Sequence, residues 1–331
     1  MKTSFLLRIL YNKIVLTLFF VGNTIFAQQI PQLTQYFFNP IVYNPAAVAT
    51  RNNINFDLAI RNQWLRIEGL PLTQTLCADL PVPLFKGGVG LSITNDILGA
   101  ERTSTLNLSY SYHQPIARRS IIAIGIQAGI LQKALYGDQL ITPNGTYTNT
   151  TINHNDNILS SNNRNALSPN FGMGLYYGSP KLQIGVAAQQ LLTPASKINL
   201  GSVDVTFKHQ LHLIINAAYQ IPLNNWTLTP TCLFKSDFNQ HQLDATLLAD
   251  WNKKYYIATT FRGYSSQTIE SAAITLAWQI NSRWRIAQSY DINLSPLKTY
   301  NSGTLETTLH YQLPPINNTR KGKTIYNSRY L

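Results

Sequence analysis

Charged residues are scarce in this chain. Asp, Glu, Lys and Arg make up 12% of its 331 residues, whereas soluble proteins carry about 25%. Asn, Gln, Ser and Thr fill many alternate positions where a soluble β-protein would place charges. A lipid-facing surface cannot carry charge cheaply, and a water-filled lumen needs polar side chains. The composition therefore favours a membrane-spanning β-protein over the alternative, a large secreted β-sandwich.

Long hydrophobic runs are also missing. The apolar stretch at residues 14–21 (IVLTLFFV) is far shorter than the roughly 20 residues that a spanning helix needs. Lys2, Arg8 and Lys13 accompany this stretch, and Ala27 is a small residue at a plausible cleavage point. Residues 1–27 therefore indicate a signal peptide that is removed on export, rather than a retained membrane anchor.

Cysteine is nearly absent, and the chain shows no pattern typical of a catalytic or metal site. Cys77 shares the polar face of its segment and Cys232 an apolar face, so no disulfide is expected between them. His154 and Asp156 lie in a long Asn-rich connection, where a solvated loop is the simpler interpretation than a cation site. No Ser/His/Asp spacing, phosphate loop or zinc pattern is present. The sequence therefore predicts a non-enzymatic protein without a cofactor.

The chain does contain a series of segments, each about ten residues long, in which apolar and polar side chains alternate. Such a period of two places successive side chains on opposite faces of a strand. About fourteen such segments predict an all-β fold, a transmembrane antiparallel β-barrel spanning residues 52–313. At residues 305–313, for example, one face carries Leu305, Thr307, Leu309, Tyr311 and Leu313, and the other carries Glu306, Thr308, His310 and Gln312.

The connections between the segments alternate in length. Short turns such as PIARR and NKK occur on one side, and the longer connections include residues 134–169, 191–207 and 292–303. In outer-membrane barrels the short turns face the periplasm and the longer loops face outward. An even strand count then places both termini in the periplasm. Residues 28–51 become a periplasmic N-terminal segment and residues 314–331 a periplasmic basic tail.

Aromatic residues flank consecutive tight turns on the short-turn side. Trp226 follows one turn, Trp251 and Tyr255 bracket the next, and Trp284 follows a third. Amphipathic rings gather where a membrane meets water, so the placement indicates a girdle. Ordinary enrichment of aromatic residues in strands is the alternative.

Basic residues outnumber acidic ones, with a formal net charge of +12 that falls by three if the signal peptide is removed. The basic residues are dispersed and no nucleic-acid-binding module is present, which excludes a nucleic acid as the partner. Many lie at predicted periplasmic turns or in the tail. They indicate either charge kept out of the hydrocarbon or a docking surface for acidic partners: Arg118, Arg119, Lys253, Lys254, Arg320, Lys321 and Lys323.

Two further segments carry candidate functional residues. The N-terminal segment contains several large apolar side chains and two Asn-Pro steps that favour turns. It is therefore expected to be a plug at the periplasmic mouth or a partner-binding arm. The first outward loop is expected to contact cargo or to cap the barrel, with Arg61, Arg66 and Glu68 pairing locally. The candidate residues are Tyr36, Phe38, Asn39, Pro40, Tyr43, Asn44 and Pro45 in the segment, and Arg61, Trp64, Glu68 and Gly69 in the loop.

Four collinear motifs resemble the PorP/SprF family of Bacteroidota outer-membrane proteins. They are QYFFNPIVYNPA within residues 31–50, RNQWLRIEGLPLTQ at residues 61–74, GVGLSITNDILG at residues 88–99, and YDINLSPLKTYNSGTLETTLHYQL at residues 290–313. Departures are Arg66 at a position where the family often has Gly, Leu305 before Glu306 in place of His, and a tail that ends in NSRYL. The tail ending bears on any partner contact specific to the tail.

The resemblance implies a role in the type IX secretion system. It implies cargo with a C-terminal signal domain, such as adhesins bearing a type B domain, and in some bacteria a link with gliding. It also implies periplasmic ring or peptidoglycan-associated components as partners, besides the outer-membrane lipid. A general porin or hydrophobic-solute channel would share the alternation and the girdle, and remains the main alternative. An outer-membrane enzyme would need a catalytic group near the outer loops, which the sequence does not supply.

Overall fold

The computed structural model describes residues 30–51, 53–67, 69–148, 152–156, 159, 161–199, 204–265 and 268–314. The expected signal peptide, Glu68 and the tail residues Arg320, Lys321 and Lys323 lie outside these ranges. Among the described residues, no helix is both long and apolar enough to cross a bilayer.

Antiparallel strands form a closed barrel of 14 strands, which confirms the predicted fold class. The first strand, β1, pairs with the last, β19. β12 pairs with β14, and the short β13 continues along the same side of β14. The strands are β1 (Ile54–Asn62), β2 (Leu72–Val82), β3 (Gly87–Leu98), β4 (Glu101–Ala117), β5 (Ser120–Leu135), β8 (Arg164–Gly178), β9 (Leu182–Gln189), β12 (His212–Tyr219), β13 (Ile221–Leu223), β14 (Trp226–Ser236), β15 (His241–Trp251), β16 (Tyr255–Arg262), β17 (Ser271–Gln279), β18 (Trp284–Asn293) and β19 (Thr304–Leu313).

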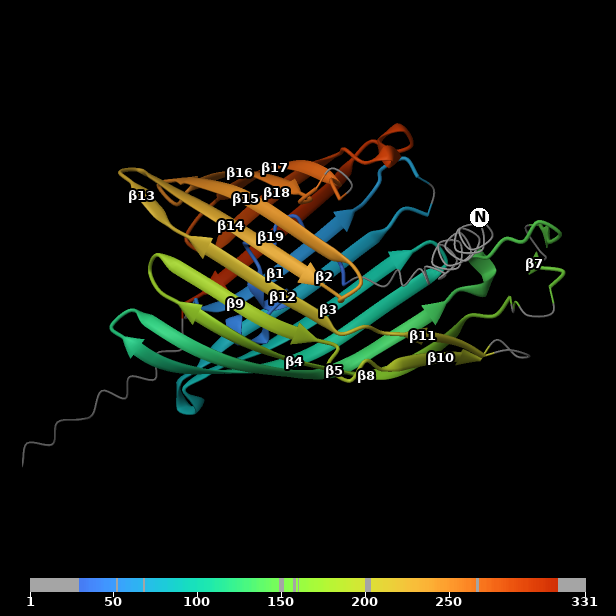
Figure 1. The fold of residues 1–331 in the computed structure, drawn as a ribbon, viewed down its shortest axis with the longest axis horizontal. Coiled ribbons are helices and arrows are strands. Elements are labelled where there is room, and N and C mark those ends of the chain that lie inside the picture. The colour runs from blue at the N-terminus through green and yellow to red at the C-terminus, as the bar shows by residue number, and fades with distance from the viewer. Residues whose placement is uncertain are drawn as a thin grey trace, which may run out of the picture.

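The two ends of the barrel differ in their connections (Figure 1). The short-turn end, at the left, holds the turns before β3, β5, β9, β14, β16 and β18. The long-connection end, at the right, carries two small hairpins: β6 (Thr146–Tyr147) with β7 (Ile152–Asn153), and β10 (Ala195–Asn199) with β11 (Asp204–Lys208). One connection at this end is nevertheless tight, because β3 ends at Leu98 and β4 begins at Glu101, with Gly99 in the left-handed region between them (φ 55°).

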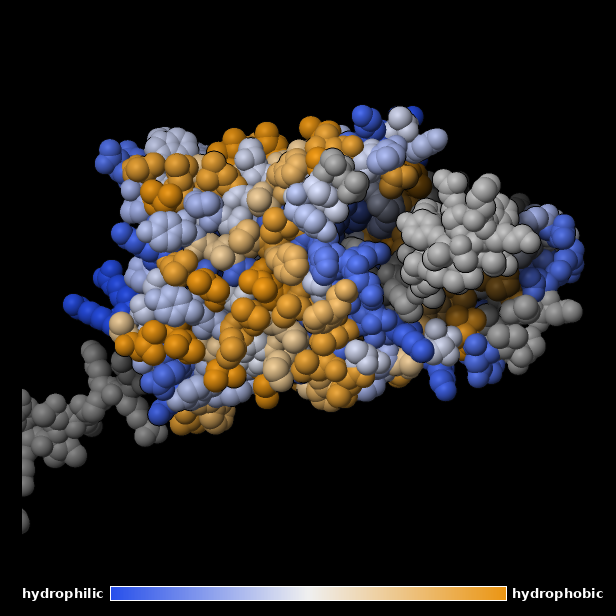
Figure 2. Space-filling view, in the orientation of Figure 1, coloured by the Kyte–Doolittle hydropathy of each residue, from blue (hydrophilic) through white to orange (hydrophobic). Residues whose placement is uncertain are grey.

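Side chains alternate between the lumen and the outer surface, as the period of two predicts. In β5, Ile122, Ile124 and Ile126 are exposed, while Ala123 and Gln127 are buried. Apolar side chains therefore gather on the outside of the strands (Figure 2), and polar side chains line the inside. This inside-out distribution is the one that a lipid-surrounded barrel requires.

Aromatic rings meet across neighbouring strands at the short-turn end. Trp226 pairs in register with Trp251, and Trp251 with Tyr255. The Trp251 and Tyr255 rings stack with centroids 5.8 Å apart, and the Trp284 and Tyr311 rings lie 4.4 Å apart. Aromatic rings thus gather on the outer surface of β14 to β16 and of β18 and β19 at this end, where the sequence predicts a girdle.

Two strand details agree with the sequence pattern. Cys77 is buried inside the barrel and Cys232 is partly exposed on the outer face of β14, and both are free thiols. Pro230 lies where β14 changes partner, between Thr231 opposite Ala218 in β12 and Leu228 opposite Ile221 in β13. Its missing N–H thus falls at an irregular point of the sheet, where proline is tolerated.

Candidate functional site

Residues 30–51, here called the lumen segment, lie inside the barrel. The Gln32 side chain donates a hydrogen bond to Glu270 at the long-connection end (3.1 Å). Farther along, the Ser111 hydroxyl donates to the carbonyl of Ala46, and the chain joins β1 at the short-turn end. The segment therefore runs along the lumen from one end to the other.

The sequence places this segment at the short-turn mouth, as a plug or as a partner-binding arm, and in the structure it extends through the lumen to the long-connection end. Ile30 and Gln32 line a cavity together with Trp64 and Glu270, which belong to the long-connection end. The sequence could not reveal this, because the polar wall residues that hold the segment are far apart in the chain.

Five charged side chains from β15, β16, β18, β19 and β1 form a buried group inside the wall, here called the charge cluster. Arg61 pairs with Asp291 (2.8 Å) and with Glu306 (3.0 Å). Arg262 pairs with Asp291 (3.2 Å) and with Asp244 (3.1 Å). All five are almost completely buried. Each charge thus has an opposite charge within ion-pair distance, which burial requires.

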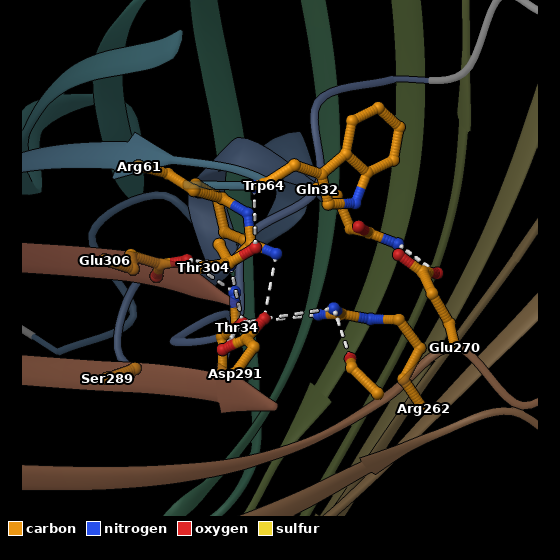
Figure 3. A network of polar contacts seen from close by, with 12 residues as sticks. Gln32, Thr34, Arg61, Trp64, Arg262, Glu270, Ser289, Asp291, Thr304 and Glu306 are labelled. Atoms are coloured by element: carbon orange, nitrogen blue, oxygen red, sulfur yellow. Dashed lines mark hydrogen bonds and ion pairs between the residues drawn. The ribbon is translucent and has the colours of Figure 1, made fainter. Parts of the chain in front are cut away.

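Thr34 of the lumen segment sits at the centre of the charge cluster (Figure 3). Its hydroxyl accepts hydrogen bonds from Arg61 (2.8 Å) and Arg262 (3.3 Å) and lies within hydrogen-bond distance of both Asp291 oxygens (2.9 and 2.7 Å). Hydrogen bonds to charged groups are stronger than neutral ones. Thr34 therefore connects the segment to β1, β16 and β18 at a single atom.

Glu306 holds the backbone of the lumen segment. Its two carboxylate oxygens accept the N–H groups of Thr34 (2.7 Å) and Gln35 (2.9 Å). The Gln35 side chain in turn donates to the backbone carbonyl of Glu306 (3.1 Å). The two contacts to the Glu306 carboxylate involve only backbone N–H groups, so they depend little on which side chains the segment carries.

Aromatic side chains fix the middle of the lumen segment. The Tyr36 hydroxyl donates to Thr246 (3.0 Å), and the Tyr43 hydroxyl accepts the N–H of Leu33 (3.1 Å). The guanidinium of Arg285 lies 4.1 Å from the centre of the Phe38 ring, a cation–π contact.

The last part of the lumen segment packs against glycines. Asn44 caps the short 3₁₀ helix η2 (Pro45–Ala47) by accepting the N–H of Ala46, and Asn39 precedes a similar turn, η1 (Pro40–Val42). A Cβ atom at Gly125 of β5 would collide with the backbone of Pro45 and Ala46, and one at Gly88 of β3 with Ala49. The wall therefore needs glycine where the segment approaches it closely.

The first loop contributes differently from expectation. Arg61 lies in β1 and points into the lumen, so its ion pairs reach β19 and β18, which are distant in sequence, instead of the predicted local group. Trp64 follows β1, and its backbone is in the left-handed region (φ 57°), as is that of Gly69 (φ 68°). The Trp64 N–H donates a hydrogen bond to the Thr304 hydroxyl (3.2 Å). Arg66 is exposed.

Cavities lie on both sides of the lumen segment. One of about 450 Å³ opens at the long-connection end and includes Val42 in its lining. Another of about 320 Å³ lies toward the short-turn end and includes Tyr36, Pro40 and Tyr43. The segment occupies the lumen between them.

The predicted docking residues of the turns are exposed at the short-turn end. Arg118 and Arg119 connect β4 with β5, and Lys253 and Lys254 connect β15 with β16. Further exposed basic residues of this end are Lys86, Lys181 and Arg283. The turns thus present basic side chains around the rim.

Sequence reasoning missed Thr34 and four members of the charge cluster: Asp244, Arg262, Asp291 and Glu306. A signal was present, because these charges lie within predicted strands on the polar face of a chain that has few charges.

A family model described as the type IX secretion system membrane protein PorP/SprF matches residues 25–311. The chain belongs to this family. It is accordingly a membrane protein of the type IX secretion system, and no curated protein matches it by sequence.

Several solved structures are similar to this PorP/SprF protein, at low sequence identity. The CymD monoaromatic hydrocarbon channel is 10% identical, with a TM-score of 0.50 over 83% of this chain and 92% of the other. A Pseudomonas aeruginosa FadL homologue is 9% identical (TM-score 0.47, 87% and 95% covered), and Acinetobacter baumannii Omp33 is 7% identical (TM-score 0.45, 79% and 99% covered). Together with the family, the barrel fold supports an outer-membrane location.

Proposed function

We propose that this protein is a non-enzymatic component that supports the secretion or surface anchoring of specific cargo. The cargo class is a protein with a C-terminal signal domain, such as an adhesin bearing a type B domain, in some bacteria with a link to gliding. The observation that carries the proposal is the occupied lumen. A barrel filled by its own residues 30–51 suits a component that contacts proteins at its two ends better than a solute pore.

Each end of the barrel has a role in this proposal. The long connections contact cargo outside the cell, with Trp64 and Gly69 in the first of them. The basic turns, with Arg118, Arg119, Lys253 and Lys254, dock to acidic surfaces of periplasmic ring or peptidoglycan-associated components. The tail with Arg320, Lys321 and Lys323 adds to the same surface.

Deletion of the gene tests the proposal. The deletion strain should lose a few specific proteins from its surface, as measured by mass spectrometry of surface-labelled proteins, while uptake of small solutes stays unchanged. A strain with an intact set of surface proteins and impaired solute uptake would support the general porin or hydrophobic-solute channel instead.

Charge reversal at the turns tests the docking surface independently of barrel assembly. A chain with Arg118, Arg119, Lys253 and Lys254 all changed to Glu should insert normally, because these side chains lie outside the strands that meet lipid. It should recover fewer periplasmic partners in pull-downs from detergent-solubilised outer membrane. The matched control changes Lys197 and Lys208 of the β10–β11 hairpin to Glu and should recover the partners unchanged.

A further inference from the structure

The part of the lumen segment at residues 30–36, here called the latch, is held by polar contacts to charged wall residues, yet it contains no charge itself. Its contributions are the Thr34 hydroxyl, the N–H groups of Thr34 and Gln35, and the Gln32 and Tyr36 side chains. All of these groups are neutral. The interaction therefore does not depend on the latch neutralising the wall.

The charge cluster stays paired without the latch. Arg61 keeps Asp291 and Glu306, and Arg262 keeps Asp291 and Asp244, because all four ion pairs join wall residues to one another. An unpaired buried charge is what makes the loss of a partner costly. Removal of the latch thus takes hydrogen bonds from the wall but leaves no charge without a counter-ion.

Residues 44–49, here called the anchor, are held by shape. Ala46 and Ala49 meet wall glycines so closely that a Cβ atom on the wall would collide with them. The N–H of Ala49 also donates to Asp79 (2.7 Å). A close fit of this kind is specific to the segment that fills it.

The latch adjoins open space. Ile30, Pro31 and Gln32 line the cavity of about 450 Å³ at the long-connection end. A second polypeptide that arrives at this end would meet the latch before it meets the anchor. The wall that it would reach already binds a polypeptide through backbone N–H groups.

We propose that the wall around the charge cluster is a binding site for a polypeptide segment in a turn conformation like that of residues 34–38, and that the latch is its intramolecular occupant, which another segment can replace. The ligand has a hydroxyl residue, then a residue with a backbone N–H, then a tyrosine. The hydroxyl takes the place of Thr34 between Arg61, Arg262 and Asp291. Glu306 accepts the two consecutive N–H groups, and the tyrosine reaches Thr246 as Tyr36 does. The anchor stays in place during the exchange.

A labelled peptide with the sequence of residues 30–38 tests the exchange on the full-length protein in detergent. Thr34→Val weakens the latch and leaves the wall unchanged, so this variant should bind the peptide at least about tenfold more tightly than the unchanged protein, by fluorescence anisotropy. A peptide that carries Val in place of its Thr should bind the same variant at least about tenfold more weakly.

Two variants serve as controls. Thr34→Ser keeps the hydroxyl and should restore the weak peptide binding of the unchanged protein. Thr50→Val removes a hydroxyl that lies outside the latch, where it donates to the carbonyl of Ala47 (2.9 Å) and contacts Tyr176 of β8, and should not raise peptide binding. Heat-modifiable mobility on gels verifies that each variant is a folded barrel. Absence of peptide binding to folded Thr34→Val protein, or equal binding of the Thr and Val peptides, would overturn the proposal.

Discussion

At the scale of the residue, the lumen is organised around a few atoms with several partners each. One Asp291 oxygen faces both arginines of the charge cluster as well as the Thr34 hydroxyl. Buried ion pairs add little net stability compared with apolar residues of the same volume, but the removal of one partner is costly because the other charge stays buried. The cluster therefore favours the correct order of strands in the barrel, because an incorrect order would leave some of these buried charges without a partner.

Asp291→Ala should destabilise the barrel by about 3–5 kcal/mol, because Arg61 and Arg262 each lose an ion pair in a buried site. The measurement is the temperature at which the folded form disappears from gels that resolve folded and heat-denatured barrels. Asp138→Ala is the matched control, because Asp138 is exposed near the long-connection end, and it should leave this temperature unchanged. An equal effect of the two changes would contradict the importance of the cluster.

At the scale of the element, the strands follow the alternation in the sequence closely, and β19 has the predicted bounds of Thr304 and Leu313. The long connections were predicted less well. β5 and β8 extend to the pair Leu135 and Arg164, beyond the predicted ends, and β10 and β11 form a hairpin where a loop was expected. β10 and β11 alternate exposed and less exposed side chains as the wall strands do. Each has only five residues, and a pattern this short predicts a strand less reliably than one of about ten residues.

Leu108→Arg and Leu84→Arg should lower the stability of the barrel by different amounts. Both leucines are nevertheless exposed: Leu108 is 62% exposed and Leu84 is 84% exposed. Leu108 lies in the middle of β4 and Leu84 lies in the turn before β3. Arginine on the lipid face costs about 2–4 kcal/mol near the midplane of the bilayer and about 0–1 kcal/mol near the interface. Folding titrations into lipid bilayers measure both. Similar costs at the two positions would be inconsistent with a lipid band around β4.

At the scale of the whole molecule, the barrel, the girdle and the family could all be predicted from local patterns and collinear motifs. The course of the lumen segment could not be. Its position depends on contacts such as that between Thr34 and Glu306, and no local pattern encodes a partner so far away in the chain. Arg61 shows the same limit, because a neighbouring Glu68 suggested local pairing while the strand geometry turns the side chain inward.

The orientation of the whole barrel can be tested by labelling on intact cells. A cysteine at Tyr300, which is 75% exposed at the long-connection end, should react with an impermeant maleimide. One at Arg118, in a short turn, should react only after lysis. The unchanged chain is the control and should stay unlabelled, because Cys77 is buried and Cys232 is on the outer face of β14. Labelling of intact cells at Arg118 alone would reverse the orientation.

The pairing of β1 with β19 closes the barrel. Because it joins the first strand of the chain to the last, it is the last strand pairing that the chain can complete. Thr34 donates its N–H across a separation of 272 residues, to Glu306 of that last strand. Contacts this distant in sequence carry the largest loop-closure entropy and form late. The N-terminal residues therefore find their full set of partners only after every strand is in place. An incomplete barrel would leave them exposed, so that a quality-control protease could distinguish an unfinished molecule from a finished one.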